Sequence, residues 1–208
     1  MNGGDKKNEE KYLVPEPQEK NSLLKEAFIF LWEIVKVVVI SLAVILPIRY
    51  YLVQPFYVKG ASMEPNFYDH EYLMVDQISY RFHEPSRGDV VVFRYPGDPS
   101  QFFIKRIIGL PNEIVRMREG KILIFNAAHP DGVEVSESYL PKEIKNLGNS
   151  SVTLGKDEYF VMGDNREESM DSRAFGPVRK KAIMGRVFFR GWPLNEITIF
   201  SEPPQYGI

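Results

Sequence analysis

The hydrophobic residues of this chain are concentrated in one early segment, which is followed by many short apolar runs. Residues 27–53 carry charges only at Glu33, Lys36 and Arg49, and residues 37–48 carry none. As a helix, the last twenty residues of this segment would extend about 30 Å, which is the thickness of the hydrocarbon layer of a membrane. The pattern therefore predicts a transmembrane anchor over residues 27–53.

The aromatic residues near the two ends of this segment are typical of a membrane interface: they are Trp32, Tyr50 and Tyr51. Two alternatives remain open. The segment could be the buried core helix of a soluble domain, or a strand, because the run VVVI is β-branched. A cleavable signal peptide is disfavoured because the apolar run starts late, is too long and is not followed by an A-x-A site.

The polar residues 1–26 come before the anchor and predict a disordered cytoplasmic tail. Three basic residues, Lys20, Lys25 and Lys36, lie on the N-terminal side of the segment. Two, Arg49 and Lys59, lie on the other side. By the positive-inside rule, this balance predicts a single pass through the cell membrane, with a cytoplasmic N-terminus and the following domain on the outer face.

Residues 54–208 form a series of short β-rich runs separated by turns. No amphipathic helix longer than about two turns interrupts them. The pattern predicts a mainly antiparallel β-sheet domain. Within it, the polar stretch 126–157 predicts an insertion or hairpin excursion outside the core. The predicted strands are YLMVDQI (72–78), DVVVFRY (89–95), FFIKRII (102–108), EIVRMR (113–118), KILIF (121–125), EYFVMG (158–163) and GRVFFR (185–190).

Composition and missing motifs exclude several classes of function. The chain has 208 residues and a formal net charge of −2, which gives no support for nucleic-acid binding. It has no cysteine, which excludes disulfides, thiolate nucleophiles and Cys-ligated metal sites. The motif H-E-x-x-H, the P-loop and G-x-G-x-x-G are absent. His83 and His129 lie in turn-like strings, which disfavours a Ser-His-Asp triad, and no metal or cofactor is expected.

Three strings remain that composition alone does not explain, and the first is GASMEP at residues 60–65. Ser62 lies there on a constrained turn between Gly60 and Pro65. On such a turn a hydroxyl and a backbone N–H can face the same space, as a nucleophile beside an oxyanion hole does. Most serines in such turns, however, are only turn residues.

The second string places Lys105 within the apolar run FFIKRII. If Lys105 is buried, its pKa falls and it can act as a base at neutral pH. In an alternating strand, Lys105 could instead point to water. The third string, at residues 163–178, is dense in Asp, Asn, Arg and Ser. It predicts either a loop held by its own side-chain hydrogen bonds or a solvated turn.

Together these strings resemble the conserved boxes of bacterial type I signal peptidase, a membrane-anchored Ser/Lys protease. GASMEP resembles the nucleophile box of that family. Three later strings follow in the family's order: RGDVVVF (87–93), IKRIIGLP (104–111) and GDNREESMDSRAFGPV (163–178). The resemblance covers about residues 25–200. It implies the β fold of that family, carried by one N-terminal transmembrane helix.

By this resemblance, Ser62 is the nucleophile and Lys105 is the general base that also protonates the leaving amine. Ser169 matches the residue that orients the lysine, and the Ser62 backbone N–H belongs to the oxyanion hole. Gly60 stands where some members carry a serine that completes this hole, so the second donor is open. The remaining residues implied by the resemblance are the supporting ion pair Asp171 and Arg173 and the substrate-pocket residues Val58, Gly60 and Ile104.

The resemblance implies an endopeptidase that removes signal peptides from exported preproteins after small residues, at sites of the Ala-x-Ala type. Its partners would be these signal peptides and the lipid bilayer, with no nucleic acid and no cofactor, and the protein is expected to be monomeric. Two alternatives remain. One is a self-cleaving repressor-type Ser/Lys protease, which would carry a DNA-binding region where this chain has a membrane segment. The other is a catalytically silent, membrane-anchored β module that binds peptides or an envelope partner.

Overall fold

The computed structural model describes residues 19–47, 53–141 and 148–200 of the chain. The chain divides into an N-terminal helical unit, residues 1–46, and a β-rich unit, residues 47–208.

A single long helix, α1 (Glu19–Pro47), makes up the described part of the N-terminal unit. Its span Leu23–Leu46 has 24 residues with a mean hydropathy of 2.5, and none of this span is buried within the protein. An apolar helix of this length fits one membrane span. Because its apolar side chains are not buried within the protein, the alternative of a core helix is wrong, and so is that of a strand.

The helix differs from the predicted anchor at both ends. Residues 19–26, which the sequence assigns to a disordered tail, are helical because Leu, Lys and Glu are good helix formers and no Gly or Pro intervenes. At the other end, α1 stops at Pro47, since proline constrains its neighbours and lacks the N–H that a helix needs. Val53 therefore begins strand β1 (Val53–Tyr57) instead of ending the anchor. The predicted tail 1–18 lies outside the described residues.

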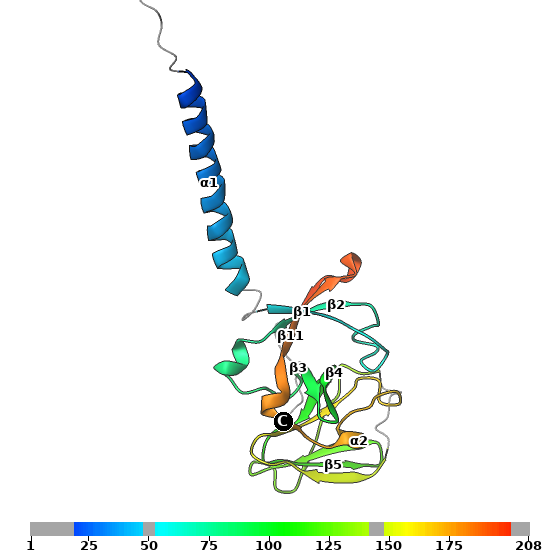
Figure 1. The fold of residues 1–208 in the computed structure, drawn as a ribbon. Helices are drawn as coiled ribbons and strands as arrows, with labels where there is room; N and C mark the ends of the chain where they lie inside the picture. Colours follow the sequence, from blue (N-terminus) through cyan, green and yellow to red (C-terminus); the bar gives the residue numbers. More distant parts are fainter. Residues whose placement is uncertain (1–18, 48–52, 142–147, 201–208) are drawn as a thin grey trace, which may run out of the picture. The chain divides into compact units, whose positions relative to one another are not determined.

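The β-rich unit is built on a large sheet with the strand order β1-β2-β11-β3-β4-β9-β10, and β12 pairs with β11. Every strand predicted from the sequence is present, and each described pair is antiparallel. Figure 1 shows β1 and β2 at one end of this unit and β5 at the other, with β3 and β4 between them. After β1, the strands of this sheet are β2 (Tyr72–Asp76), β3 (Val90–Tyr95), β4 (Asp98–Gly109), β9 (Glu158–Met162), β10 (Val178–Arg179), β11 (Ile183–Trp192) and β12 (Thr198–Ile199).

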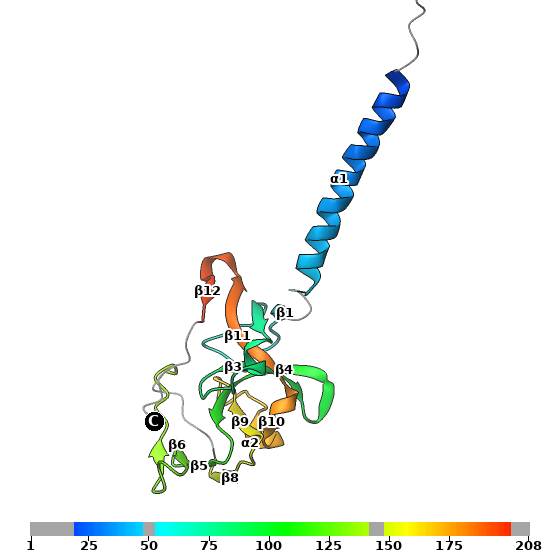
Figure 2. The same ribbon diagram turned by 90° about the vertical axis from the view of Figure 1, so that its left-hand side faces the viewer.

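A second, four-stranded sheet has the order β7-β6-β5-β8. Figure 2 shows β5, β6 and β8 lying together, away from β1. The segment 126–157 is not only an excursion, because it supplies both edge strands of this sheet and buries Val135 and Leu154 in its core. These isolated apolar residues in a polar stretch give little periodic signal, which is why the sequence did not predict their burial. The strands are β5 (Ile114–Arg118), β6 (Lys121–Phe125), β7 (Val133–Glu134) and β8 (Ser150–Thr153).

Apolar clusters lie against both faces of the large sheet, so the first half of β3 and the second half of β4 are buried. On β3, Val90 belongs to one apolar cluster and Val91 to another, as the alternation of a pleated strand requires. On β4, Lys105 pairs with Val91, and Arg106 pairs with Val90. These two basic side chains therefore lie on opposite faces of the sheet, and both residues are buried.

We expect Leu154→Ala to lower the free energy of unfolding by about 2–5 kcal/mol, because the residue is 2% exposed in the core of the second sheet. Ser150→Ala, at an exposed position on the adjoining strand, should change it by less than about 0.5 kcal/mol. Urea denaturation followed by circular dichroism measures both. Equal stability of Leu154→Ala and the parent would contradict a core role for this segment.

Candidate active site

The candidate nucleophile Ser62 lies in a tight turn that follows β1. The chain leaves its pairing with β2 near Val58, whose N–H donates to the carbonyl of Glu71 over 2.9 Å. Gly60 then adopts a φ of +89°, in the left-handed region that favours glycine. After the turn, Met63 is 1% exposed and packs in the apolar core. This anchoring leaves Ser62 half-buried beside the sheet.

Lys105 reaches this turn from β4. The residue is 4% exposed, and its Nζ donates to Ser62 Oγ over 2.7 Å and to the carbonyl of Ile104 over 2.8 Å. The alternative in which Lys105 points to water is therefore wrong. A separation of this size lies within the range of about 2.6–3.2 Å that is typical of a nucleophile and its base.

Burial changes the protonation of Lys105. Loss of hydration disfavours the ammonium form and lowers the pKa of Lys105 to about 8, although the negative charges of Asp171 and Asp164 act in the opposite direction. The aromatic ring of Phe103, whose centre lies 5.5 Å from Nζ, is part of these surroundings. An ordinary lysine has a pKa of about 10.4. Near pH 8, a substantial fraction of Lys105 is therefore neutral and able to accept a proton.

The predicted ion pair in the 163–178 loop is present, with Asp171 buried and Arg173 half-buried. Arg173 donates to Asp171 through both Nε and Nη2, each over 2.8 Å. Asp171 also caps the short helix α2 (Ser172–Phe175) and accepts the Gly163 N–H over 2.9 Å. Burial favours a higher pKa for Asp171, but the Arg173 guanidinium and the Gly163 N–H outweigh it and hold the pKa below its ordinary value.

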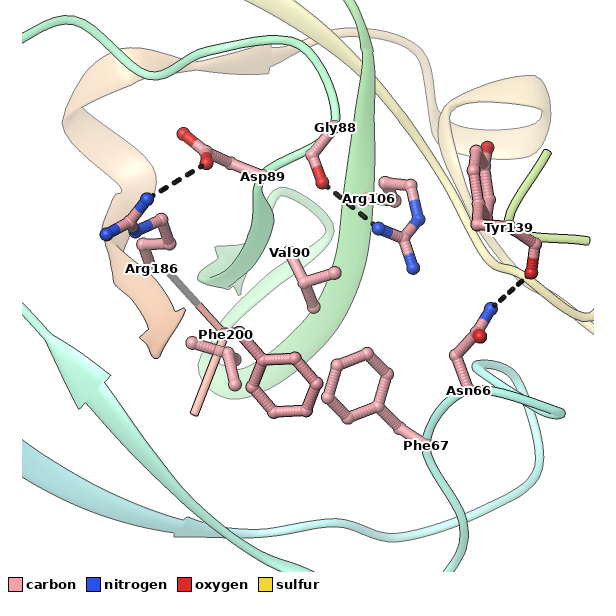
Figure 3. A pocket seen from close by; sticks show the side chains of 10 residues that line it. Asn66, Phe67, Gly88, Asp89, Val90, Arg106, Tyr139, Arg186 and Phe200 are labelled. Carbon is pink, nitrogen blue, oxygen red and sulfur yellow. Dashed lines mark hydrogen bonds and ion pairs between the residues drawn. The ribbon is translucent and has the colours of Figure 1, made fainter. Parts of the chain in front are cut away.

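A second buried network of hydrogen bonds involves the nucleophile turn, which is the turn at residues 60–67 that carries Ser62. Arg106 donates from Nε to Asp164 over 2.8 Å and from Nη1 to the carbonyl of Gly88 over 3.1 Å. Asn66 donates to Asp164 over 2.9 Å and to the carbonyl of Tyr139 over 3.2 Å. Figure 3 shows Arg106, Asn66 and Tyr139 around a cavity of about 270 Å³, which none of the predicted site residues lines. The network ties the nucleophile turn to β4.

Two residues that the sequence did not single out hold the backbone of Ser62. The Asn165 N–H donates to the Ser62 carbonyl over 3.1 Å, and its side-chain amide donates to the Ala61 carbonyl over 3.2 Å. Gly163 packs against the same segment, since a Cβ on it would come within 2.4 Å of the Ser62 carbonyl oxygen. The polar density of the 163–178 loop was the only signal for these contacts, and it does not identify their partners.

The structure does not join the predicted orienting residue Ser169 to the lysine. Its Oγ is buried, but among the described residues no hydrogen bond links it to Lys105, which bonds to Ser62 and the Ile104 carbonyl. The hydroxyl lies instead against Gly163, where a Cβ would come within 2.2 Å of it. The orienting role of Ser169 stays a prediction.

A groove of about 580 Å³ runs beside Ser62 and Lys105. Val58 and Ile104, two of the predicted pocket residues, line it. Gly60, the third, is not among its lining residues, and its N–H donates to Asp69. The other large apolar and aromatic residues of the groove are Phe56, Tyr57, Leu73, Val92, Phe102, Phe103 and Met170. The site thus combines a hydroxyl, a buried amine and an apolar groove.

The part of the chain that the structure describes contains no group of three or more His, Cys, Asp or Glu side chains that could hold a metal ion. At the groove, Ser62 supplies a hydroxyl and Lys105 a buried amine, with backbone groups around them. This combination suits nucleophilic acyl transfer.

Comparison with known proteins identifies the family. A family model described as signal peptidase, peptidase S26, matches residues 31–192. The chain belongs to this peptidase family. Signal peptidase I of Leptolyngbya laminosa is 36% identical over 186 residues, which cover 85% of this chain and 87% of that protein. Signal peptidase IB of Staphylococcus aureus (strain MRSA252) is 32% identical over 180 residues, which cover 79% of this chain and 93% of that protein.

A crystal structure of a signal peptidase I from Enterococcus faecalis V583 is also similar, with 31% identity and a TM-score of 0.43 over 50% of this chain and 97% of that one. The family resemblance inferred from the four sequence boxes is thus confirmed by the family model and the two relatives. The chain is a peptidase of the signal peptidase family with one apolar helix that fits a membrane span.

We expect Asp171→Ala to lower the free energy of unfolding by about 3–5 kcal/mol, because it leaves Arg173 largely buried without its partner. The pKa of Asp171 is lowered on folding, so the carboxylate stabilises the fold above its unfolded pKa of about 3.9. The advantage of the parent should therefore be complete at neutral pH and shrink as the pH falls below about 4.

Glu134→Ala is the matched control, because Glu134 forms an exposed ion pair with Lys121. This variant should cost at most about 1 kcal/mol. Denaturation curves recorded from pH 3 to pH 8 measure both variants. An Asp171→Ala protein as stable as Glu134→Ala would contradict the supporting role of the buried pair.

Proposed function

We propose that this protein is a membrane-bound serine endopeptidase that removes signal peptides from exported preproteins, with Ser62 as nucleophile and Lys105 as general base. One observation carries the proposal: the buried Nζ of Lys105 lies 2.7 Å from Ser62 Oγ. Membership of the signal peptidase family supports it independently.

Each step of the reaction has a group available to perform it. Neutral Lys105 accepts the proton of Ser62 Oγ while Oγ attacks the scissile carbonyl carbon. The Ser62 N–H, which donates no hydrogen bond to any described residue, stabilises the resulting oxyanion. The C–N bond then breaks, Lys105 returns the proton to the leaving amine, and an acyl ester remains on Ser62. A water molecule deprotonated by Lys105 hydrolyses that ester.

The groove supports a preference for small side chains. Val58 and Ile104, both branched, line the groove beside Ser62, and a shallow pocket between them would admit alanine and exclude longer side chains. An extended peptide can lie in such a groove as an added strand. We therefore assign Ala-x-Ala type sites to this enzyme.

The apolar helix suits the same function. We propose a single pass with a cytoplasmic N-terminus and the catalytic unit on the outer face of the cell membrane, where signal peptides emerge from the bilayer. Holding enzyme and substrate at one surface raises their effective concentration. The protein is proposed to act as a monomer on signal peptides and the bilayer, with no nucleic acid and no cofactor.

The alternative of a catalytically silent, membrane-anchored β module that binds peptides or an envelope partner is less well supported. A binding module has no need of a lysine buried at 4% exposure beside a serine hydroxyl, because that arrangement costs free energy. A repressor-type protease is disfavoured by the long apolar helix.

Ser62→Ala and Lys105→Met should each lower kcat/KM by roughly 10³-fold or more, by analogy with other serine hydrolases. The double variant should be little worse than either, because the two residues act as a unit. The assay incubates the detergent-solubilised full chain with a preprotein carrying an Ala-x-Ala site and sequences the new N-terminus.

The matched controls are Ser136→Ala and Lys121→Met, which change an exposed serine and an exposed lysine of the same unit. Both should cleave as the parent does. Near-parental turnover in folded Ser62→Ala or Lys105→Met would refute the assignment of the catalytic pair, and cleavage elsewhere in the preprotein would refute the assigned specificity.

The pH dependence follows from the lowered pKa of Lys105, which is about 8. Since only the neutral amine accepts the serine proton, kcat/KM should fall about tenfold for each pH unit below that value. The shape of the profile should be unchanged in His70→Ala, His83→Ala and His129→Ala. An acidic limb centred near the histidine value of about 6.5, abolished by one of these substitutions, would identify a histidine as the base and exclude Lys105.

A further inference from the structure

A carboxylate outside the catalytic pair bonds to the nucleophile turn. Asp69 Oδ1 accepts the N–H of Gly60, two residues before Ser62, over 2.9 Å. The other oxygen, Oδ2, pairs with His70 Nδ1 over 2.8 Å. A hydrogen bond to a charged carboxylate is stronger than one between neutral groups. Asp69 is thus in a position to hold the backbone from which the nucleophile projects.

Packing does not hold Gly60 in place. A Cβ built on it would meet no atom within 4 Å. Before Gly60, the backbone of Val58 is hydrogen-bonded to the segment that precedes β2. After Gly60, Asn165 is hydrogen-bonded to the carbonyls of Ala61 and Ser62. Between these two anchors, among the described residues, the Gly60 N–H bonds to Asp69. The position of the turn at Gly60 therefore depends on this one acceptor.

The backbone is strained at the residue next to Asp69. His70 has a φ of 69°, in a region that costs a residue with a side chain roughly 1–3 kcal/mol. Its ring lies edge-on to the ring of Tyr57, with 5.7 Å between centroids, and its N–H donates to the Val58 carbonyl over 3.1 Å. Strain of this kind persists only where the surrounding structure maintains it, and it occurs often at functional sites. Here it turns the chain next to the residue that bonds Gly60.

We propose that Asp69 is a positioning residue for the nucleophile: its carboxylate holds the Gly60 N–H and thereby sets Ser62 relative to Lys105. This inference rests on the proposed function of Ser62 and Lys105. Gly60 has no hydroxyl and its N–H is bonded to Asp69, so it supplies no donor to the oxyanion. Stabilisation of the oxyanion therefore depends more strongly on where the Ser62 N–H lies. A shift of about 1 Å in an active site can lower a rate about 100-fold.

Three variants of the full chain test this role. Asp69→Ala removes the acceptor and should lower kcat about 10- to 100-fold, with KM within about twofold, because the groove residues are unchanged. Asp69→Asn keeps a side-chain oxygen that can accept the Gly60 N–H, so its kcat should stay within about threefold of the parent. Glu134→Ala, which removes an exposed carboxylate of the second sheet, should match the parent.

Amide hydrogen exchange at Gly60, measured by ¹⁵N NMR in detergent micelles, reports on the hydrogen bond without any need for activity. Exchange should be at least about tenfold faster in Asp69→Ala than in the parent, and close to the parent in Asp69→Asn and Glu134→Ala. Melting temperatures within a few degrees of the parent would separate positioning from unfolding. If Asp69→Ala does not fold, retained kcat and slow exchange in Asp69→Asn still support the proposal.

Two results would overturn the proposal. A parental kcat in Asp69→Ala, together with fast exchange at Gly60, would show that the bond exists but does not position the nucleophile. A loss in folded Asp69→Asn as large as in Asp69→Ala would show that the charge acts, and not the hydrogen bond. Either result leaves the catalytic pair intact, whereas full activity in Ser62→Ala would refute the proposed function and leave the exchange result at Gly60 standing.

Discussion

Burying the Lys105 amine beside Ser62 opposes the stability of the fold, and the catalytic unit is organised around this conflict. A pKa of about 8 instead of the ordinary lysine value corresponds to about 3 kcal/mol against the charged form. A buried lysine needs a strand that is covered on both faces. It also needs a hydrogen-bond partner in each protonation state, which Ser62 Oγ and the Ile104 carbonyl provide. The same burial makes the amine a base at working pH.

The acidic residues near Lys105 favour its charged form, and this effect would be stronger if they were left unpaired. Asp171 and Asp164 both raise the lysine pKa, so a full negative charge on either would favour the ammonium form. Each is bonded to a buried or half-buried arginine, Asp171 to Arg173 and Asp164 to Arg106. These pairs fix the loop and the turn that carry the site while they offset the charges beside the lysine. Structural support and control of the lysine pKa are therefore one arrangement.

Alternation and turn signals were enough to predict the strands, because each predicted run buries at least one face. They did not predict that Lys105 is buried. In a strand with apolar surroundings on both faces, the sequence pattern does not show which polar side chain is buried. The helix begins at residue 19 because α1 continues into the polar residues before the apolar span, which the hydrophobic pattern does not mark. The segment 126–157 joins the second sheet through a few isolated buried residues, which give no periodic pattern. The bond from Asn165 to Ala61 joins residues 104 positions apart, and only the fold reveals such a partner.

The central claim is that burial keeps Lys105 partly neutral next to Ser62. A ¹³C NMR titration of lysine Cε in the full-length protein measures this directly, with the Lys105 signal assigned by its absence in Lys105→Met and with exposed Lys121 as internal reference. The account predicts that Lys105 titrates with a pKa of about 8, well below Lys121. A Lys105 signal that titrates near the ordinary value of about 10.4 in the folded protein would contradict it.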